Sequence, residues 1–281
     1  MRFCFHNWVG KAALAVALLP LASAPASAQG RGPKPPEGAA PRLNGKPDFS
    51  GMWQRPYVPE MTVTTRNHDQ VADASLPDAP TAPGQAAPKG PPGPPRKELP
   101  FTPEGKKIWE AYDPAKGDYT GSCLPFGLIR SMNSPDPIQI MQSDQYLALL
   151  YEQNTWFKVF HVDGRPHRDQ VGTWFGDSVG HWEGDTLVVD TVNFNGKTRL
   201  DTIGHPHSDQ LRTVERFTRT DAGHIAYEIT INDPKYYTKP WKNTRVFTLR
   251  PDWEIMEYSC EENNKDILEG HIKPGVVPES H

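Results

Sequence analysis

Apolar and polar residues alternate along most of the chain from residue 138 onward. Tyr227, Ile229 and Ile231 are apolar, whereas Glu228 and Thr230 between them are polar. A period of two turns one face of a strand toward a core and the other toward solvent. Short turn sequences containing Ser, Asp, Gly or Pro separate these runs. The predicted strands span 138–142, 146–152, 156–162, 179–182, 186–193, 211–219, 224–231, 244–249 and 254–260.

The order of these strands predicts the fold class. About nine strands follow one another with no helical pattern between them, which predicts a mainly β domain with antiparallel neighbours. An up-and-down barrel is favoured over a sandwich because closure of the sheet leaves no exposed edge. The chain shows no internal repeat of fixed period, which argues against a propeller.

The region before the strands is rich in proline. More than half of the 30 prolines lie between residues 29 and 100. The densest stretch, 77–96, cannot form a helix or a central strand because proline lacks the amide donor, so we expect an extended strap or linker. Within this region, 47–53 predicts a short strand docked on the domain through its aromatic residues. We therefore expect a strap over 29–100 and a barrel domain over 101–281.

One helix is predicted, over 103–112. Thr102 can cap it, Pro103 suits the first helical position, and Glu104 lies at the positive end of the helix dipole. Ile108, Trp109 and Tyr112 give the helix an apolar side, and the sequence Asp-Pro that follows ends it.

The first 28 residues have the pattern of a secretory signal. Arg2 and Lys11 are basic, residues 12–19 form an apolar run, and Ala26-Ser27-Ala28 is a small-residue cleavage site. The apolar run is shorter than the roughly 20 residues that span a bilayer. We expect cleavage after Ala28 and a periplasmic or secreted protein, the alternative being a retained membrane anchor.

Export changes the charge and the cysteine chemistry. Loss of residues 1–28 removes two basic residues and no acidic one, which moves the formal net charge from −4 to −6. An acidic protein is not expected to bind nucleic acid. Cys4 lies in the signal, so Cys123 and Cys260 remain in a compartment that permits a disulfide. Two buried free thiols are the alternative.

Seven short motifs are spread over most of the mature chain, and they are Gly45–Trp53 (GKPDFSGMW), Cys123–Arg130 (CLPFGLIR), Asp163–His167 (DGRPH), Trp182–Val189 (WEGDTLVV), Gly204–Ser208 (GHPHS), Glu215–Phe217 (ERF) and Asp233-Pro234. In these motifs the chain resembles a family of uncharacterised exported bacterial proteins. The resemblance implies export and a small lipocalin-like β domain, without an established reaction. Where the family usually has Arg, this chain has His181, so a site that uses this position is altered here.

The loop 201–209 holds the densest group of polar residues. Its two imidazoles, His205 and His207, lie within a few residues of Asp201, and histidine titrates near neutral pH. We expect His205 and His207 to act as acid and base, with Asp201 orienting one ring. The alternative is a polar loop whose histidines brace a turn.

Two other chemistries are weaker alternatives. The His-x-His pair can bind zinc or copper if further histidines contribute, but no complete ligand set is present in the sequence. Residues 176–180 match G-x-S-x-G, but the nucleophile elbow needs a strand-to-helix turn, and here another strand follows. We therefore predict neither a metal nor a cofactor, and keep a His-ligated metal protein as a secondary alternative.

Several residues are candidates for contacts with a substrate. Arg165 and His167 can bind a carboxylate at a barrel mouth. Glu215 and Arg216 must point to opposite faces of one strand, and we expect Arg216 to be the inward charge, near Glu152 or Asp190. The substrate-binding set is Arg165, His167, His181, Trp182 and Arg216.

These observations predict a periplasmic β-barrel that binds an apolar or aromatic small molecule. Abundant aromatic residues suit such a pocket. If the protein is an enzyme, we expect a cofactor-independent lyase, isomerase or hydrolase. The alternative from another class is a non-catalytic carrier or protein-interaction module.

Overall fold

The computed structural model describes residues 33–65, 68–79, 95–113, 118–262, 264, 265 and 269. The predicted signal, 1–28, and most of the proline-rich stretch 77–96 lie outside these residues. The chain divides into the units Met1–Lys34 and Pro35–His281, and the second unit contains all the helices and strands of the described chain. Among the described residues, no helix has the length and apolar character needed to cross a membrane.

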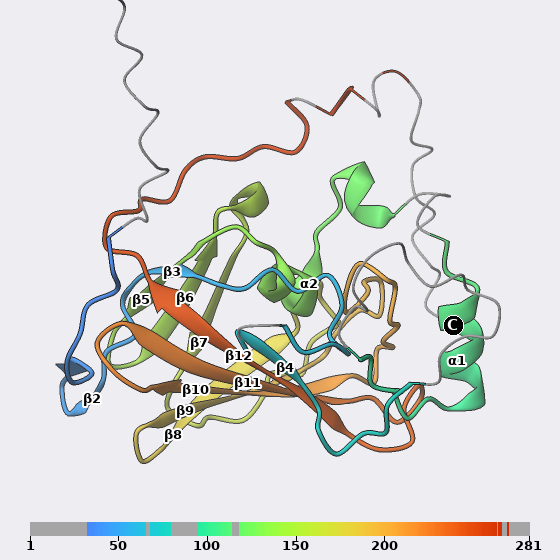
Figure 1. Cartoon of the computed structure of the whole chain (residues 1–281), viewed down its shortest axis with the longest axis horizontal. Helices are drawn as coiled ribbons and strands as arrows, with labels where there is room; N and C mark the ends of the chain where they lie inside the picture. The colour runs from blue at the N-terminus through green and yellow to red at the C-terminus, as the bar shows by residue number, and fades with distance from the viewer. Residues whose placement is uncertain are drawn as a thin grey trace, which may run out of the picture. The chain divides into compact units, whose positions relative to one another are not determined.

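Nine strands of the described chain close into a barrel (Figure 1). Each strand pairs with the next, β3 pairs with β5, and β12 pairs with both β11 and β3, which closes the ring. The predicted barrel is thereby confirmed. The strands are β3 (Gly51–Gln54), β5 (Ile138–Gln142), β6 (Tyr146–Tyr151), β7 (Phe157–His161), β8 (Asp177–Glu183), β9 (Thr186–Val192), β10 (Arg212–Arg219), β11 (His224–Asn232) and β12 (Trp241–Leu249).

The alternation seen in the sequence places the core inside the barrel. On β11, Ile225, Tyr227, Ile229 and Ile231 are buried, and the residues between them are more exposed. Cross-strand partners share a face, so Phe217 of β10 faces inward opposite Tyr227. Burial of these apolar faces is the main favourable contribution to folding.

Two features differ from an antiparallel up-and-down barrel. β7 and β8 pair in parallel, through His161 and Val179, because the connection 162–176 returns to the end of the barrel at which β7 began. The predicted strand 254–260 is wrong, since these residues contain no strand. β3, which lies within the expected strap, is the ninth barrel strand instead.

The remaining elements are short. β1 (Arg42–Leu43) pairs with β2 (Lys46–Pro47), and β4 (Gln70–Ala72) pairs with β12 beside β3. The helices are α1 (Pro103–Glu110), α2 (Gly127–Asn133) and the 3-10 turns η2 (Tyr119–Ser122) and η3 (Gln153–Thr155). The predicted helix is confirmed as α1, whose first turn is capped by Thr102 Oγ1, which accepts from the Gly105 amide at 3.1 Å.

The two ends of the barrel differ. At one end, which we call the hairpin end, short turns join β5 to β6, β8 to β9, and β10 to β11. At the opposite end, the loop end, the long connections before β5, after β6, between β9 and β10, and between β11 and β12 gather with α1 and α2 (Figure 1). Loops on a rigid scaffold are where binding and catalytic residues concentrate.

Helix α2 was not predicted, and all seven of its residues are buried. Two buried arginines bind its C-terminal carbonyls. Arg55 Nη1 donates to Ser131 O at 2.5 Å, and Arg245 Nη1 donates to Met132 O at 2.9 Å. Positive charge is favourable at this negative end of a helix. Burial lowers the pKa of each of these two arginines to about 10.

Cys123 and Cys260 form a disulfide, as the first of the two alternatives predicted. It fastens the segment after β12 to the residues just before α2. The bond is compatible with an oxidising compartment.

Burial raises the pKa of the four tyrosines that are at most 5% exposed above the ordinary value of 10. We refer to them as the buried tyrosines, and they are Tyr119, Tyr151, Tyr227 and Tyr237.

Candidate functional site

The loop between β9 and β10 brings Asp201 and His205 together at the loop end. His205 Nδ1 lies 2.7 Å from Asp201 Oδ2, and Asp201 also accepts from the amides of Met61 at 3.0 Å and His205 at 3.3 Å. Both side chains are almost fully buried. The carboxylate of Asp201 therefore fixes the orientation of the ring, with Nδ1 directed at Oδ2.

The charge of Asp201 is stabilised within this cluster. Burial alone would raise the pKa of Asp201. The neighbouring His205 and the hydrogen bonds from His205 and the Met61 amide outweigh burial and lower it below the ordinary 3.8.

His207 lies apart from this pair. Its Nε2 is 2.5 Å from Thr198 Oγ1, its Nδ1 is 3.0 Å from Ser208 O, and Phe194 packs edge-on against the ring. Burial lowers the pKa of His207, which favours the neutral ring. The hydrogen-bond partners of His205 and His207 thus differ, and no hydrogen bond joins the two rings among the described contacts.

Aromatic rings enclose His205. Trp109 of α1 and Phe101 lie 5.2 and 6.0 Å from it between ring centroids. Neither histidine lines the pockets that the described residues form beside Ile108, Arg130 and Arg216. The geometry of Asp201 and His205 fits an oriented acid–base pair. It fits equally well a buried hydrogen bond that only stabilises the loop.

The predicted substrate-binding residues do not meet at one place. Arg165 is exposed and pairs with Asp163 at 2.6 Å. His181 is exposed on the outer face of β8 and lies 3.3 Å from Glu183. Trp182 faces the other way and stacks on Phe49 at 5.8 Å.

His167 is held between two carboxylates. Its Nδ1 is 3.0 Å from Asp177 Oδ2, and its Nε2 is 3.0 Å from Asp190 Oδ2. Each ring nitrogen of His167 thus faces a carboxylate oxygen. Arg168 and Arg212 complete the cluster by pairing with Asp177 and Asp190, respectively. The contacts of this cluster hold the connection between β7 and β8 in place.

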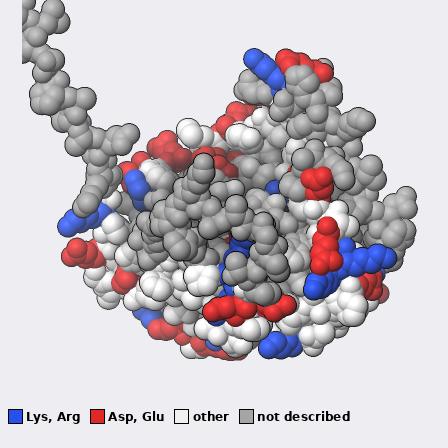
Figure 2. Space-filling view, turned by 45° about the vertical axis from the view of Figure 1, so that its right-hand side comes forward, with Lys and Arg blue, Asp and Glu red and all other residues white. Residues whose placement is uncertain are grey.

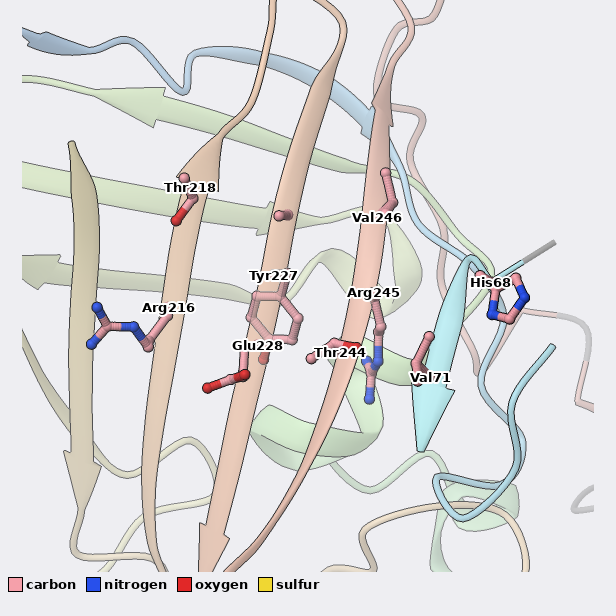
Figure 3. A pocket seen from close by; sticks show the side chains of 10 residues that line it. His68, Val71, Arg216, Thr218, Tyr227, Glu228, Thr244, Arg245 and Val246 are labelled. Carbon is pink, nitrogen blue, oxygen red and sulfur yellow. The ribbon is translucent and has the colours of Figure 1, made fainter. Parts of the chain in front are cut away.

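The expected orientation of Arg216 is wrong. Arg216 lies on the outer face of β10 and pairs with Glu183 at 2.9 Å, whereas Glu215 is fully buried. Arg216 borders a groove of about 420 Å³ on the outside of β10, β11 and β12. Figure 3 shows Arg216, Glu228 and Thr244 on these three strands, with His68 just before β4.

The inward-facing charge of this strand is Glu215, not Arg216, and it forms a buried ion pair inside the barrel. Lys158 Nζ lies 3.1 Å from Glu215 Oε2, and Tyr227 donates to Glu215 Oε1 at 3.0 Å. Burial lowers the pKa of Lys158, although the charge of Glu215 opposes the change. The alternation along 157–161 places Lys158 on the inward face of the strand. This was the sequence signal from which a buried charge at Lys158 could have been predicted.

A pocket of about 200 Å³ lies at the loop end, between η3 and the C-terminal end of α2. We call it the end pocket, and it is lined by Tyr57, Val58, Phe126, Arg130, Asn133, Ser134, Pro135, Gln153 and Thr202. Five of these nine residues are polar, but most of the accessible surface of the pocket is apolar, which is the usual make-up of a small-molecule site.

Two residues that line the end pocket each carry a buried acceptor without a partner among the described residues. Asn133 is 3% exposed, and its Nδ2 donates to Leu200 O at 2.6 Å, which leaves Oδ1 unpaired. Gln153 Oε1 is likewise buried and unpaired. A buried polar atom without a partner costs about 1–3 kcal/mol, but these two atoms have almost no accessible surface and so do not offer an acceptor to a molecule in the pocket.

Arg130 connects the end pocket to the Asp201–His205 pair. It lines the pocket, its Nη1 donates to Asp118 Oδ2 at 3.0 Å and to Asp201 O at 3.2 Å, and its guanidinium lies over the ring of Phe126. Arg130 and Asn133 were not predicted as site residues, although Arg130 is the last residue of one of the motifs that carry the family resemblance.

The rest of the described surface gives no stronger candidate. No group of three or more His, Cys, Asp or Glu side chains in the described part of the chain is placed to hold a metal ion. On the face in Figure 2, acidic and basic side chains lie beside one another over the described surface.

Comparison with models of protein families gives no match, and a search of curated proteins finds no matching sequence. The function is therefore inferred from the geometry of the site.

Proposed function

We propose that this protein binds a small, mainly apolar molecule in the end pocket. The observation that carries the proposal is the pocket itself, whose accessible surface is mainly apolar and is lined by the aromatic rings of Tyr57 and Phe126 beside the guanidinium of Arg130. The pocket lies where the long connections gather, at the mouth of a barrel, which is a common place for ligand sites.

Binding explains the geometry better than catalysis does. His205 and Asp201 do not line the end pocket, and Thr202 and Arg130 stand between them and it. The buried pair therefore supports the pocket wall. The signal pattern and the disulfide support export, so the proposed setting is the periplasm, and the resemblance to exported bacterial proteins is consistent with it.

Native mass spectrometry of the mature protein from its own host tests this proposal. We expect a retained small molecule in the wild type and its loss in Tyr57→Ala, because Tyr57 lines the end pocket and is 51% exposed. Tyr146→Ala is the matched control, since Tyr146 is 41% exposed at the hairpin end. Equal retention by both variants, or no retained molecule in the wild type, would contradict the proposal.

A further inference from the structure

The side chain of Arg199, in the loop between β9 and β10, has no acceptor among the described residues. Three other arginines at this end of the barrel each have one. Arg130 forms an ion pair, and Arg55 and Arg245 donate to carbonyls of α2. The guanidinium of Arg199 instead lies over the ring of Tyr112, at 5.5 Å from its centroid, and forms neither a hydrogen bond nor an ion pair within the described part of the chain.

The charge of Arg199 is partly removed from water without compensation by a carboxylate. The residue is half-buried, and burial lowers the pKa of Arg199 below its ordinary 12.5. The groups that oppose this change most are tyrosines, of which Tyr112 and Tyr119 are the largest contributors. A cation that loses hydration without gaining a partner costs free energy, so an added anion is favourable here.

The nitrogens of Arg199 are nevertheless accessible. None of them is among the enclosed and unpaired polar atoms of the described residues. Since they also have no hydrogen-bond partner there, they reach the surface. Arg199 and Tyr112, over whose ring the guanidinium lies, both line a hollow of about 290 Å³ that is open to solvent. The donors of Arg199 are therefore available to a molecule in this hollow.

This hollow, which we call the arginine hollow, lies between the C-terminal end of α1 and the loop before β10. It is lined by Ile108, Ala111, Tyr112, Asp113 and Arg199. The first three provide an apolar wall, and Arg199 provides a planar fork of donors. A few polar groups beside apolar surface are the usual composition of a small-molecule site.

The charges of the arginine hollow favour an anion with a single negative charge. A guanidinium matches the two oxygens of a carboxylate or a phosphate. Asp113 lines the same hollow without an ion pair to Arg199, so its carboxylate repels a dianion more than a monoanion. A carboxylate is therefore favoured over a phosphate monoester, and the apolar wall suits the carbon body that carries it.

We propose that the arginine hollow is a second binding site, which takes a small monocarboxylate through Arg199 and packs its apolar body against Ile108 and Tyr112. The arginine hollow shares no lining residue with the end pocket, so this inference goes beyond the binding function proposed above and does not depend on it.

The test measures calorimetric affinities of the mature full-length protein for benzoate, for benzamide, which has nearly the same shape without the charge, and for phenyl phosphate. Arg199→Met removes the charge and keeps much of the side-chain length. Arg42→Met is the control, because Arg42 is an arginine at the hairpin end whose side chain is 48% exposed. Ala111→Glu and Ala111→Gln form a second matched pair at an exposed position of the hollow, alike in size and different in charge.

We expect the wild type to bind benzoate at least about tenfold more tightly than benzamide, which is the effect of a hydrogen bond to a charged group. Arg199→Met abolishes this preference, and Arg42→Met keeps it. Ala111→Glu weakens benzoate several-fold relative to Ala111→Gln and leaves benzamide unchanged. Tyr57→Ala, which alters the end pocket, leaves the affinity for benzoate unchanged.

Four results would overturn the inference. If benzoate does not bind, or if Arg199→Met keeps the preference for benzoate, Arg199 is not an anion site. Equal benzoate affinity in the two Ala111 variants places benzoate outside the arginine hollow, and this pair decides the matter even if Arg199→Met fails to fold. Tighter binding of phenyl phosphate than of benzoate shows a phosphate site. Loss of benzoate binding in Tyr57→Ala places the carboxylate in the end pocket.

Discussion

The buried Lys158–Glu215 pair offers the sharpest test of how the barrel is held together. Their side chains are 4% and 1% exposed, and the charged atoms are 3.1 Å apart. At an effective dielectric constant of 20, two unit charges at this distance attract by about 5 kcal/mol. Desolvation of both charges opposes this gain, so the pair adds far less than about 5 kcal/mol to the free energy of unfolding. Each charge is nevertheless tolerated in the barrel interior only because the other is present.

Removal of one partner is therefore expected to cost more than removal of both charges. Lys158→Met leaves the buried Glu215 carboxylate without its cation, and such a loss costs about 3–5 kcal/mol. In the double variant Lys158→Met/Glu215→Gln, no charge is left, and the amide oxygen of Gln can still accept from Tyr227. We expect the double variant to lie within about 1 kcal/mol of the wild type, because neutral replacements of buried pairs are often tolerated.

The assay is urea unfolding of the wild type, both single variants and the double variant, with the disulfide intact. The coupling energy follows from the double-mutant cycle, provided the slope of the unfolding free energy against urea is the same in all four. The exposed pair Arg216–Glu183, at 2.9 Å, serves as the control, and its coupling should not exceed about 1 kcal/mol and should fall with salt. A cost below about 1 kcal/mol for Lys158→Met, or a double variant as unstable as the sum of the singles, would show that the two buried charges do not depend on each other.

Three further predictions concern the disulfide, Asp201 and the buried tyrosines. Cys123→Ala/Cys260→Ala should lower the unfolding free energy in urea by about 2–4 kcal/mol, because the bridge closes a long loop, and dithiothreitol should have no further effect on that variant. The folded-state pKa of Asp201 lies below 3.8, so its charge contributes stability above about pH 4 that is lost as the pH falls through the lower folded-state value. Asp201→Asn should therefore flatten this part of an acid unfolding curve followed by circular dichroism. The pKa values of the buried tyrosines are raised, so their contribution to stability is complete below pH 10 and is lost as the pH rises. Absorbance at about 295 nm should show them ionising together with unfolding rather than before it. Ionisation of the buried tyrosines in a protein whose circular dichroism is still native would contradict this.

Alternation predicted most of the barrel, and its one false strand has a physical explanation. Residues 254–260 carry apolar side chains such as Met256 and Tyr258, yet these are 68% and 47% exposed. A strand needs a partner with free hydrogen-bonding groups. β12, the strand before this segment, is paired with β11 on one edge and with β3 and β4 on the other, so no edge is left for another strand.

Alternation also shows that Glu215 and Arg216 face opposite ways, but not which of them faces inward. The answer comes from Lys158, which lies on β7, three strands away around the ring from β10. A buried carboxylate is tolerated where a cation lies across the barrel, and Arg216 instead finds Glu183 on the surface. Local sequence contains none of this information, because the partner is set by the closure of the ring.

The end pocket depends on the part of the chain where binary patterning fails. All residues of α2 are buried, including Arg130 and Asn133, so the helix has no polar face by which a sequence pattern could reveal it. Its C-terminal carbonyls are bound by Arg55 and Arg245, which come from segments far apart in sequence. At its C-terminal end, Asn133 Nδ2 donates to Leu200 O at 2.6 Å. Local rules are expected to fail at functional sites, and a fully buried helix held at its end by distant segments is such a failure. The end pocket lies against this helix, which is the physical reason for placing the function of the protein there rather than at the histidines that stand out in the sequence.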